Sequence, residues 1–125
     1  MPWMSGGGCL ITRDFLRMGL LFARKGMGVG NRKVGSSSFL NKTIVNVGPK
    51  YMNLSKDKYL YYSNSTMVSD NMIGHSGYGG QFLATNFKTG NVAAFFSVLE
   101  TKSATKDSYK TDMINMLIDI VNKKY

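Results

Sequence analysis

Residues 69–90, SDNMIGHSGYGGQFLATNFKTG, contain three short segments whose residue types could serve hydrolytic chemistry: S-D-N, H-S-G and K-T-G. The H-S-G segment places the imidazole of His75 beside the hydroxyl of Ser76, and imidazole exchanges a proton near neutral pH. Gly77, Gly79 and Gly80 follow it, and glycines weaken a strand unless another group approaches the main chain closely. This pattern predicts ligand contact with bare backbone; a glycine-rich surface loop that carries a histidine is the alternative interpretation.

The K-T-G segment at 88–90 stands between two apolar runs, FLATNF and VAAFFSVLE. A lysine in this triplet can hold a substrate carboxylate when the triplet lies on a strand that lines a cleft. A Gly- and Asn-containing connection between two apolar runs instead predicts a β-hairpin, with the triplet in its turn. We therefore interpret K-T-G as turn residues. S-D-N at 69–71 is interpreted as part of a polar loop.

A nucleophile of the Ser-x-x-Lys type occurs twice by letter, at Ser55 to Lys58 and at Ser103 to Lys106. About one such match is expected by chance in a chain of this composition. The chemistry needs a serine at the start of a buried helix and a desolvated lysine one turn later. The first match leads into a strand-like segment and the second opens a surface helix, so neither predicts a catalytic serine.

The elements that would position these residues follow from periodicity. Phe15, Met18 and Phe22 recur at helical spacing and predict an amphipathic helix over 12–25. The stretch 26–38 is expected to be loop, 39–56 irregular, and 60–68 (LYYSNSTMV) one strand. The hairpin spans about 82–100, and apolar repeats predict a closing helix over about 105–123. The expected fold class is α+β, with an antiparallel sheet and flanking helices.

Composition excludes several classes of protein. The 125 residues suit one domain or part of one, and 43% hydrophobic content excludes a disordered chain. No apolar run is long enough to span a membrane, and one Cys with one His makes a zinc site implausible. No cofactor is expected. The net charge of +9 comes from scattered basic residues without a run or a nucleic-acid motif, so we expect no nucleic-acid partner.

Two motifs together resemble a known family. Residues 6–26, GGGCLITRDFLRMGLLFARKG, resemble the GGG-x-x-x-T-x-x-D-x-A-R-x-G-x-L-x-x-x-x-G segment of β-lactamase-related serine hydrolases. This is the class C-like, penicillin-binding-protein-like branch with esterases, D-aminopeptidases and 6-aminohexanoate-dimer hydrolase. An H-S-G-x-G-G box replaces K-T-G in that branch, and the order of strand, box, hairpin and closing helix is similar over nearly all of the chain.

The resemblance implies the C-terminal part of a β-lactamase/transpeptidase-like fold, residues 1–125, with the nucleophile-bearing region upstream. It implies that His75 and Ser76 contact the substrate or the proton network. The backbone N–H of Tyr78 would be an oxyanion donor, and Gly77, Gly79 and Gly80 would lie against the acyl group. The substrate would be a small ester, amide or peptide, hydrolysed through an acyl-enzyme.

Two other functions remain open at this point. The chain can be a non-catalytic binding or regulatory module of the same fold, because it lacks a credible nucleophile. It can also be an unrelated basic α+β domain that binds nucleic acid, for which salt-dependent binding of DNA or RNA is the discriminating measurement.

Overall fold

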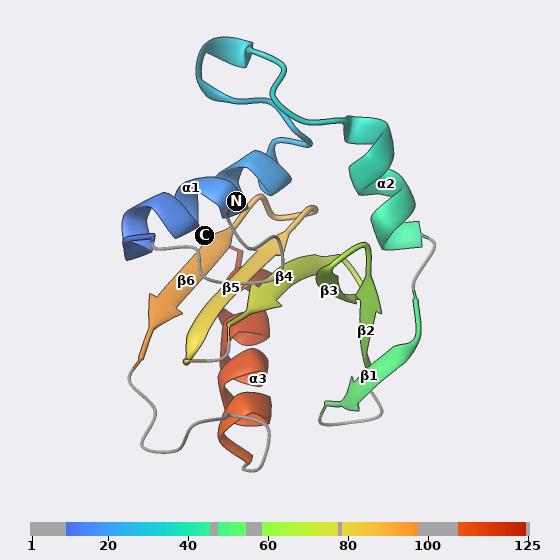
Figure 1. The fold of residues 1–125 in the computed structure, drawn as a ribbon, viewed down its shortest axis with the longest axis vertical. Helices are drawn as coiled ribbons and strands as arrows, with labels where there is room; N and C mark the ends of the chain where they lie inside the picture. The colour runs from blue at the N-terminus through green and yellow to red at the C-terminus, as the bar shows by residue number, and fades with distance from the viewer. Residues whose placement is uncertain (1–9, 46–47, 55–58, 78, 98–107, 125) are drawn as a thin grey trace, which may run out of the picture.

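The protein is an α+β fold built on one six-stranded antiparallel sheet (Figure 1). The computed structural model describes residues 10–45, 48–54, 59–77, 79–97 and 108–124. The strands are paired in chain order, β1-β2-β3-β4-β5-β6, and every pairing is antiparallel. The strands are β1 Lys50–Asn53, β2 Tyr59–Ser63, β3 Thr66–Ser69, β4 Met72–Ser76, β5 Gln81–Asn86 and β6 Val92–Phe96. The helices are α1 Thr12–Ala23, the short 3-10 helix η1 Val29–Asn31, α2 Ser37–Val45 and α3 Ser108–Asn122.

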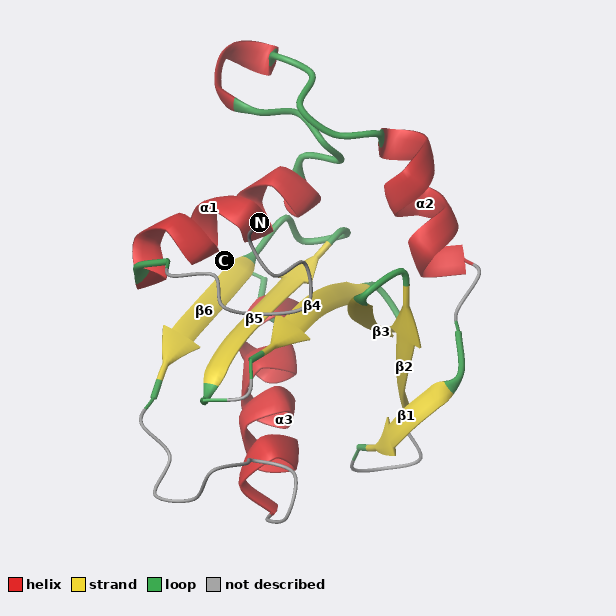
Figure 2. Cartoon of the chain, viewed as in Figure 1, coloured by secondary structure: helices red, strands yellow, loops and turns green. Residues whose placement is uncertain are grey.

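The helices cover opposite faces of the sheet (Figure 2). Helix α3 packs its apolar side on one face, against side chains that include Phe82 of β5 and Leu60 of β2. Helices α1 and α2 share the other face, where Leu40 of α2 and Phe22 of α1 contact Ile73 of β4. Because strand side chains alternate between faces, each strand contributes to both cores.

Helix α1 approaches the sheet closely at Gly19. A Cβ atom at this position would collide with the side chains of Val92 and Leu83. The Thr85 hydroxyl donates to the Gly19 carbonyl at 3.2 Å, which joins the helix backbone to β5. The absence of a side chain at Gly19 thus sets the distance between α1 and the β5–β6 hairpin.

The predicted helix over 12–25 is confirmed, with an end two residues earlier. The chain reverses at Lys25 and Gly26, both with positive φ, and the Gly26 N–H donates to the Leu21 carbonyl at 2.8 Å. This is a Schellman-type end, which satisfies carbonyls that the helix leaves free.

The closing helix is also confirmed, over Ser108–Asn122, while residues 105–107 lie outside the described ranges. The apolar series that predicts this helix, Met113, Met116, Leu117, Ile120 and Val121, coincides only in part with its buried side. Met116 is exposed and Ile120 half-buried, whereas the buried positions are Lys110, Ile114, Leu117, Ile118 and Val121.

The hairpin is confirmed as β5 and β6, with residues 98–100 outside the described ranges. Lys88, Thr89 and Gly90 lie in its turn, where Gly90 takes a positive φ of 77°. The Thr89 hydroxyl donates to the Val121 carbonyl at 2.7 Å. The K-T-G triplet therefore ties the hairpin turn to the end of α3.

Three predictions were wrong. Residues 37–45 form helix α2 and residues 50–53 form strand β1, where loop and irregular structure were expected. Residues 60–68 form two strands instead of one, because Asn64 and Ser65 turn the chain with positive φ values of 47° and 61°. Positive φ at both central residues is typical of a type I′ hairpin turn.

Candidate functional site

The H-S-G segment ends the central strand β4. His75 lies opposite Leu83 and Ser76 opposite Phe82 of β5. Successive strand residues point to opposite faces, so the side chains of His75 and Ser76 leave the strand in opposite directions. The Ser76 hydroxyl donates to the Met67 sulfur at 3.6 Å. The two residues therefore do not form a serine–histidine pair with each other.

His75 is half-buried, and its environment favours the neutral imidazole. Burial lowers the pKa of His75 below its ordinary value of 6.5, and the positive charge of Lys110 lowers it further. A backbone hydrogen bond with Ser65 opposes both effects. His75 is therefore neutral near pH 7 and can both donate and accept a hydrogen bond.

The glycines after Ser76 form a tight connection to β5. The Gly77 N–H donates to the Gln81 carbonyl at 2.7 Å, and Gly80 takes a positive φ of 93°. The side-chain amide of Gln81 folds back over this connection and accepts a hydrogen bond from the Gly79 N–H at 3.2 Å. A Cβ on Gly77 would collide with this amide. The strip of backbone predicted to be bare thus has one flexible side chain lying on it.

Tyr78, the predicted oxyanion donor, lies outside the described residues, as do both Ser-x-x-Lys matches. The predicted site residues that the structure does describe are close in space through the β4–β5 connection. They are His75, Ser76, Gly77, Gly79 and Gly80.

Two further polar residues, on α3 and β1, were missed by the sequence reasoning. The Lys110 ammonium, on α3, donates to the hydroxyl of Tyr51, on β1, at 2.7 Å. Lys110 is only 8% exposed, and its charge acts on His75. A signal was present in the sequence, because Lys110 continues the apolar helical series of Ile114, Leu117 and Val121 toward the start of α3.

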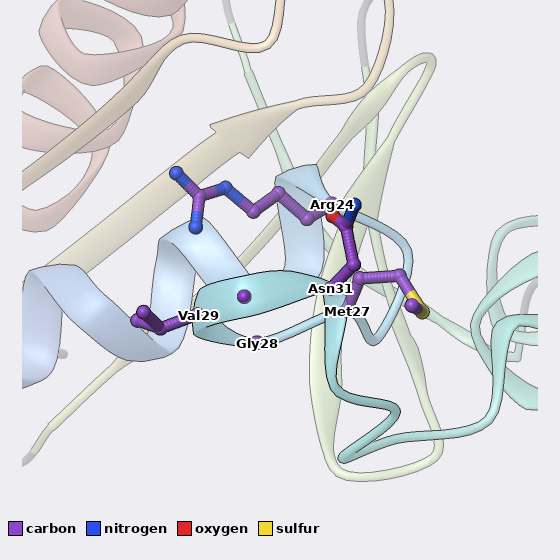
Figure 3. Close-up of a pocket in the computed structure, with 6 residues that line it drawn as sticks. Arg24, Met27, Gly28, Val29 and Asn31 are labelled. Carbon is purple, nitrogen blue, oxygen red and sulfur yellow. The ribbon is translucent and has the colours of Figure 1, made fainter.

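A separate hollow lies after α1, at the loop around η1 (Figure 3). Its volume is about 670 Å³ and it is widely open to solvent. The side chains of Arg24 and Met27 extend from it in different directions (Figure 3). His75 and the glycine connection do not line it, so it is not part of the predicted site.

In the described ranges of the chain, no three His, Cys, Asp or Glu side chains gather to hold a metal ion. No helix in those ranges has the length and apolar character needed to cross a membrane.

Comparison of the chain with protein-family models, with curated proteins and with solved structures gave no match. The interpretation of the site consequently depends on its own residues and geometry.

Proposed function

We propose that this chain forms one wall of a serine hydrolase active site of the esterase, amidase or peptidase type. In this proposal the nucleophilic serine lies on polypeptide outside the 125 residues. The observation that carries it is the position of H-S-G at the end of the central strand β4, followed directly by the glycine connection. The neutral, half-buried imidazole of His75 at this strand end is suited to hydrogen bonding with a substrate or a proton carrier.

The chemistry would be acyl transfer. The serine oxygen attacks the substrate carbonyl while a base on the completing polypeptide takes the serine proton, and the base then returns this proton to the leaving group, which departs as an alcohol or amine. Water then hydrolyses the acyl-enzyme. The backbone N–H of Tyr78 would donate to the oxyanion, and loss of one such donor costs on the order of a hundredfold in rate.

The glycine connection would contact the acyl group only after Gln81 moves. Among the described residues, the amide of Gln81 is held by one hydrogen bond, which it accepts from the Gly79 N–H at 3.2 Å, and a flexible side chain can rotate away. We therefore expect a substrate to displace this amide and to take over its place against Gly77 and Gly79.

The free edge of β6 supports completion by another polypeptide. Positions 91 and 97 exchange hydrogen bonds with β5, namely Asn86 N–H to the Asn91 carbonyl and Ser97 N–H to the Gly80 carbonyl, both at 3.0 Å. By alternation, the backbone groups of Val92, Ala94 and Phe96 point away from β5. In the described parts of the chain no strand pairs with them.

The two edges of the sheet differ in how they are protected. Strand β1 carries an exposed lysine, Lys50, and a register shift between Lys50 and Met52, both of which discourage pairing. Strand β6, VAAFF, has neither a charge nor a proline. An unprotected apolar edge favours pairing with a further strand, which the completing polypeptide would provide.

Complementation tests the proposal. The chain is mixed with the N-terminal part of an esterase of the resembled branch, cut before its GGG segment, and assayed with p-nitrophenyl esters and a fluorophosphonate. The chain alone should show neither turnover nor labelling. The mixture should gain both, and His75→Ala should reduce turnover while the matched surface change Lys123→Ala leaves it unchanged.

Two results would overturn the proposal. Covalent labelling of a serine in the isolated chain would show that the nucleophile is internal. Formation of the mixed complex without any turnover would favour the alternative of a non-catalytic binding module. An in-frame Ser-x-x-Lys codon pattern in the coding sequence upstream of Met1 would independently support the hydrolase.

A further inference from the structure

Lys110 is a buried cation whose partners are neutral. It lies in the first turn of α3, is 8% exposed, and donates to the Tyr51 hydroxyl at 2.7 Å. Its ammonium also lies 4.8 Å from the centroid of the Tyr51 ring. Among the described residues no carboxylate pairs with it. A buried charge without an opposite charge is costly, so its environment calls for an explanation.

The contact between the two side chains leaves donors unused. An ammonium group has three donors and no acceptor. The Tyr51 oxygen accepts from Lys110, so the tyrosine proton must point elsewhere, and no acceptor for it occurs among the described residues. The pair therefore presents N–H and O–H donors together, and an oxyanion is the group that accepts from both.

The surrounding potential is positive as well. Lys110 lies near the N-terminal end of α3, where the helix dipole attracts anions. Its charge also reaches the imidazole of His75, because it lowers the pKa of that residue. Beside the donors, the rings of Tyr51 and Tyr62 lie 5.8 Å apart between centroids and are 46% and 39% exposed. An approach from solvent is thus open on the Tyr51 side.

We infer that Lys110 and Tyr51 form a binding site for an oxyanion, the carboxylate or phosphate group of a small ligand, whose remaining part lies on the exposed rings of Tyr51 and Tyr62. The anion accepts from the Lys110 ammonium and from the Tyr51 hydroxyl. The anion supplies the negative charge opposite Lys110 that no described residue supplies. The site is independent of the hydrolase proposal, since it needs neither a nucleophile nor a completing polypeptide.

Titration of the isotope-labelled protein followed by NMR tests the site. Inorganic phosphate and acetate are added in separate arms at constant ionic strength, with shifts read at Lys110, at the Tyr51 ring and at His75. Lys110→Met should weaken binding about tenfold or more, because it removes a charge-assisted hydrogen bond. Tyr51→Phe keeps the ring, removes the hydroxyl, and should weaken binding several-fold.

Lys50→Met is the matched control. Lys50 lies on β1 beside Tyr51, is exposed, and its ammonium sits 3.3 Å from the Tyr59 ring centroid, so this change removes an equal charge from the strand that carries Tyr51. The affinity of Lys50→Met for phosphate or acetate should equal that of the parent protein.

Each outcome of the titration has a defined meaning. Binding of phosphate alone or of acetate alone supports the site and identifies the ligand class. An equal loss of affinity in Lys50→Met and Lys110→Met would show a diffuse effect of net charge and overturn the inference. Absence of localised shifts with either anion at tens of millimolar would also overturn it. Should Lys110→Met fail to fold, the anion affinities of Tyr51→Phe and Lys50→Met are compared instead. An equal loss of affinity in these two variants would overturn the inference.

Discussion

Replacement of Lys110 by methionine should stabilise the protein in the absence of anions. Methionine keeps the length and packing of the lysine stem without its charge. Burial of an ammonium costs several kcal/mol even after relaxation. Against this stand one hydrogen bond to the neutral Tyr51 hydroxyl, about 1.5–3 kcal/mol, and a cation–π contact of about 0.5–2 kcal/mol. Because Tyr51 is 46% exposed, its hydroxyl regains water when the lysine is lost.

Because replacement of a buried charge by an apolar side chain of similar volume is often neutral or stabilising by about 1–4 kcal/mol, and one hydrogen bond is lost here, we expect a gain of about 1 kcal/mol in the free energy of unfolding of Lys110→Met. Urea denaturation in a non-coordinating buffer measures it, as a higher midpoint with an unchanged slope. The exposed control Lys50→Met should change the same free energy by less than about 0.5 kcal/mol. Phosphate at ten times its dissociation constant should stabilise the parent protein by about 1.4 kcal/mol and leave Lys110→Met unaffected.

A loss of more than about 1 kcal/mol in the free energy of unfolding of Lys110→Met would contradict an unfavourable burial of the Lys110 charge. That result would mean that the hydrogen bond to Tyr51 outweighs the cost of burying the ammonium. It would remove the need for an external anion at the same time.

Three further predictions follow from the packing and the titration. Because burial and Lys110 lower the pKa of His75, the unfolded chain binds more protons below pH 6.5, so stability should fall as pH drops below that value. His75→Gln should flatten this dependence in urea titrations at several pH values, and NMR of the single histidine should give a pKa below 6.5. Gly19→Val should destabilise the fold by about 1–3 kcal/mol, because its side chain would overpack against Val92 and Leu83. The control Leu20→Val, on the exposed side of α1, should cost well under 1 kcal/mol. Equal losses of stability in the two variants, measured by calorimetry, would contradict the close approach of α1 to the β5–β6 hairpin. Phe82→Ala should cost about 3–5 kcal/mol because this ring is fully buried and stacked on Phe95 at 5.1 Å, and a loss below about 1 kcal/mol by thermal or urea unfolding would contradict its place in the core.

The sequence predicted an element correctly where the residues of that element alone show a clear hydrophobic pattern. The helix at 12–25 and the closing helix repeat apolar residues at helical spacing, and the β5–β6 hairpin has apolar runs on both sides of a glycine turn. The fold class could be predicted because these elements already combine helices with antiparallel strands.

The missed elements depend on contacts that are distant in sequence. Helix α2 has exposed residues over most of its length, and it is fixed by Leu40 in the core and by Thr43. The Asn64 side chain donates to the Thr43 hydroxyl at 2.8 Å, across 21 residues. The same Asn64 turns β2 into β3, where the sequence predicted one continuous strand.

The lysine of the K-T-G motif and the buried lysine of the fold are different residues, and packing explains why. The K-T-G triplet contains a lysine, yet its place at a hairpin turn assigns it to the end of α3, where the Thr89 hydroxyl satisfies a free carbonyl. The buried lysine is Lys110, which belongs to no motif, meets its partner Tyr51 across 59 residues, and influences His75 through its charge alone. Only packing of α3 against the sheet creates that pair. A charged side chain within an apolar helical stripe is therefore an indicator, readable from the sequence, of a buried polar contact, because the stripe carries the charge into the interior, where it needs a partner.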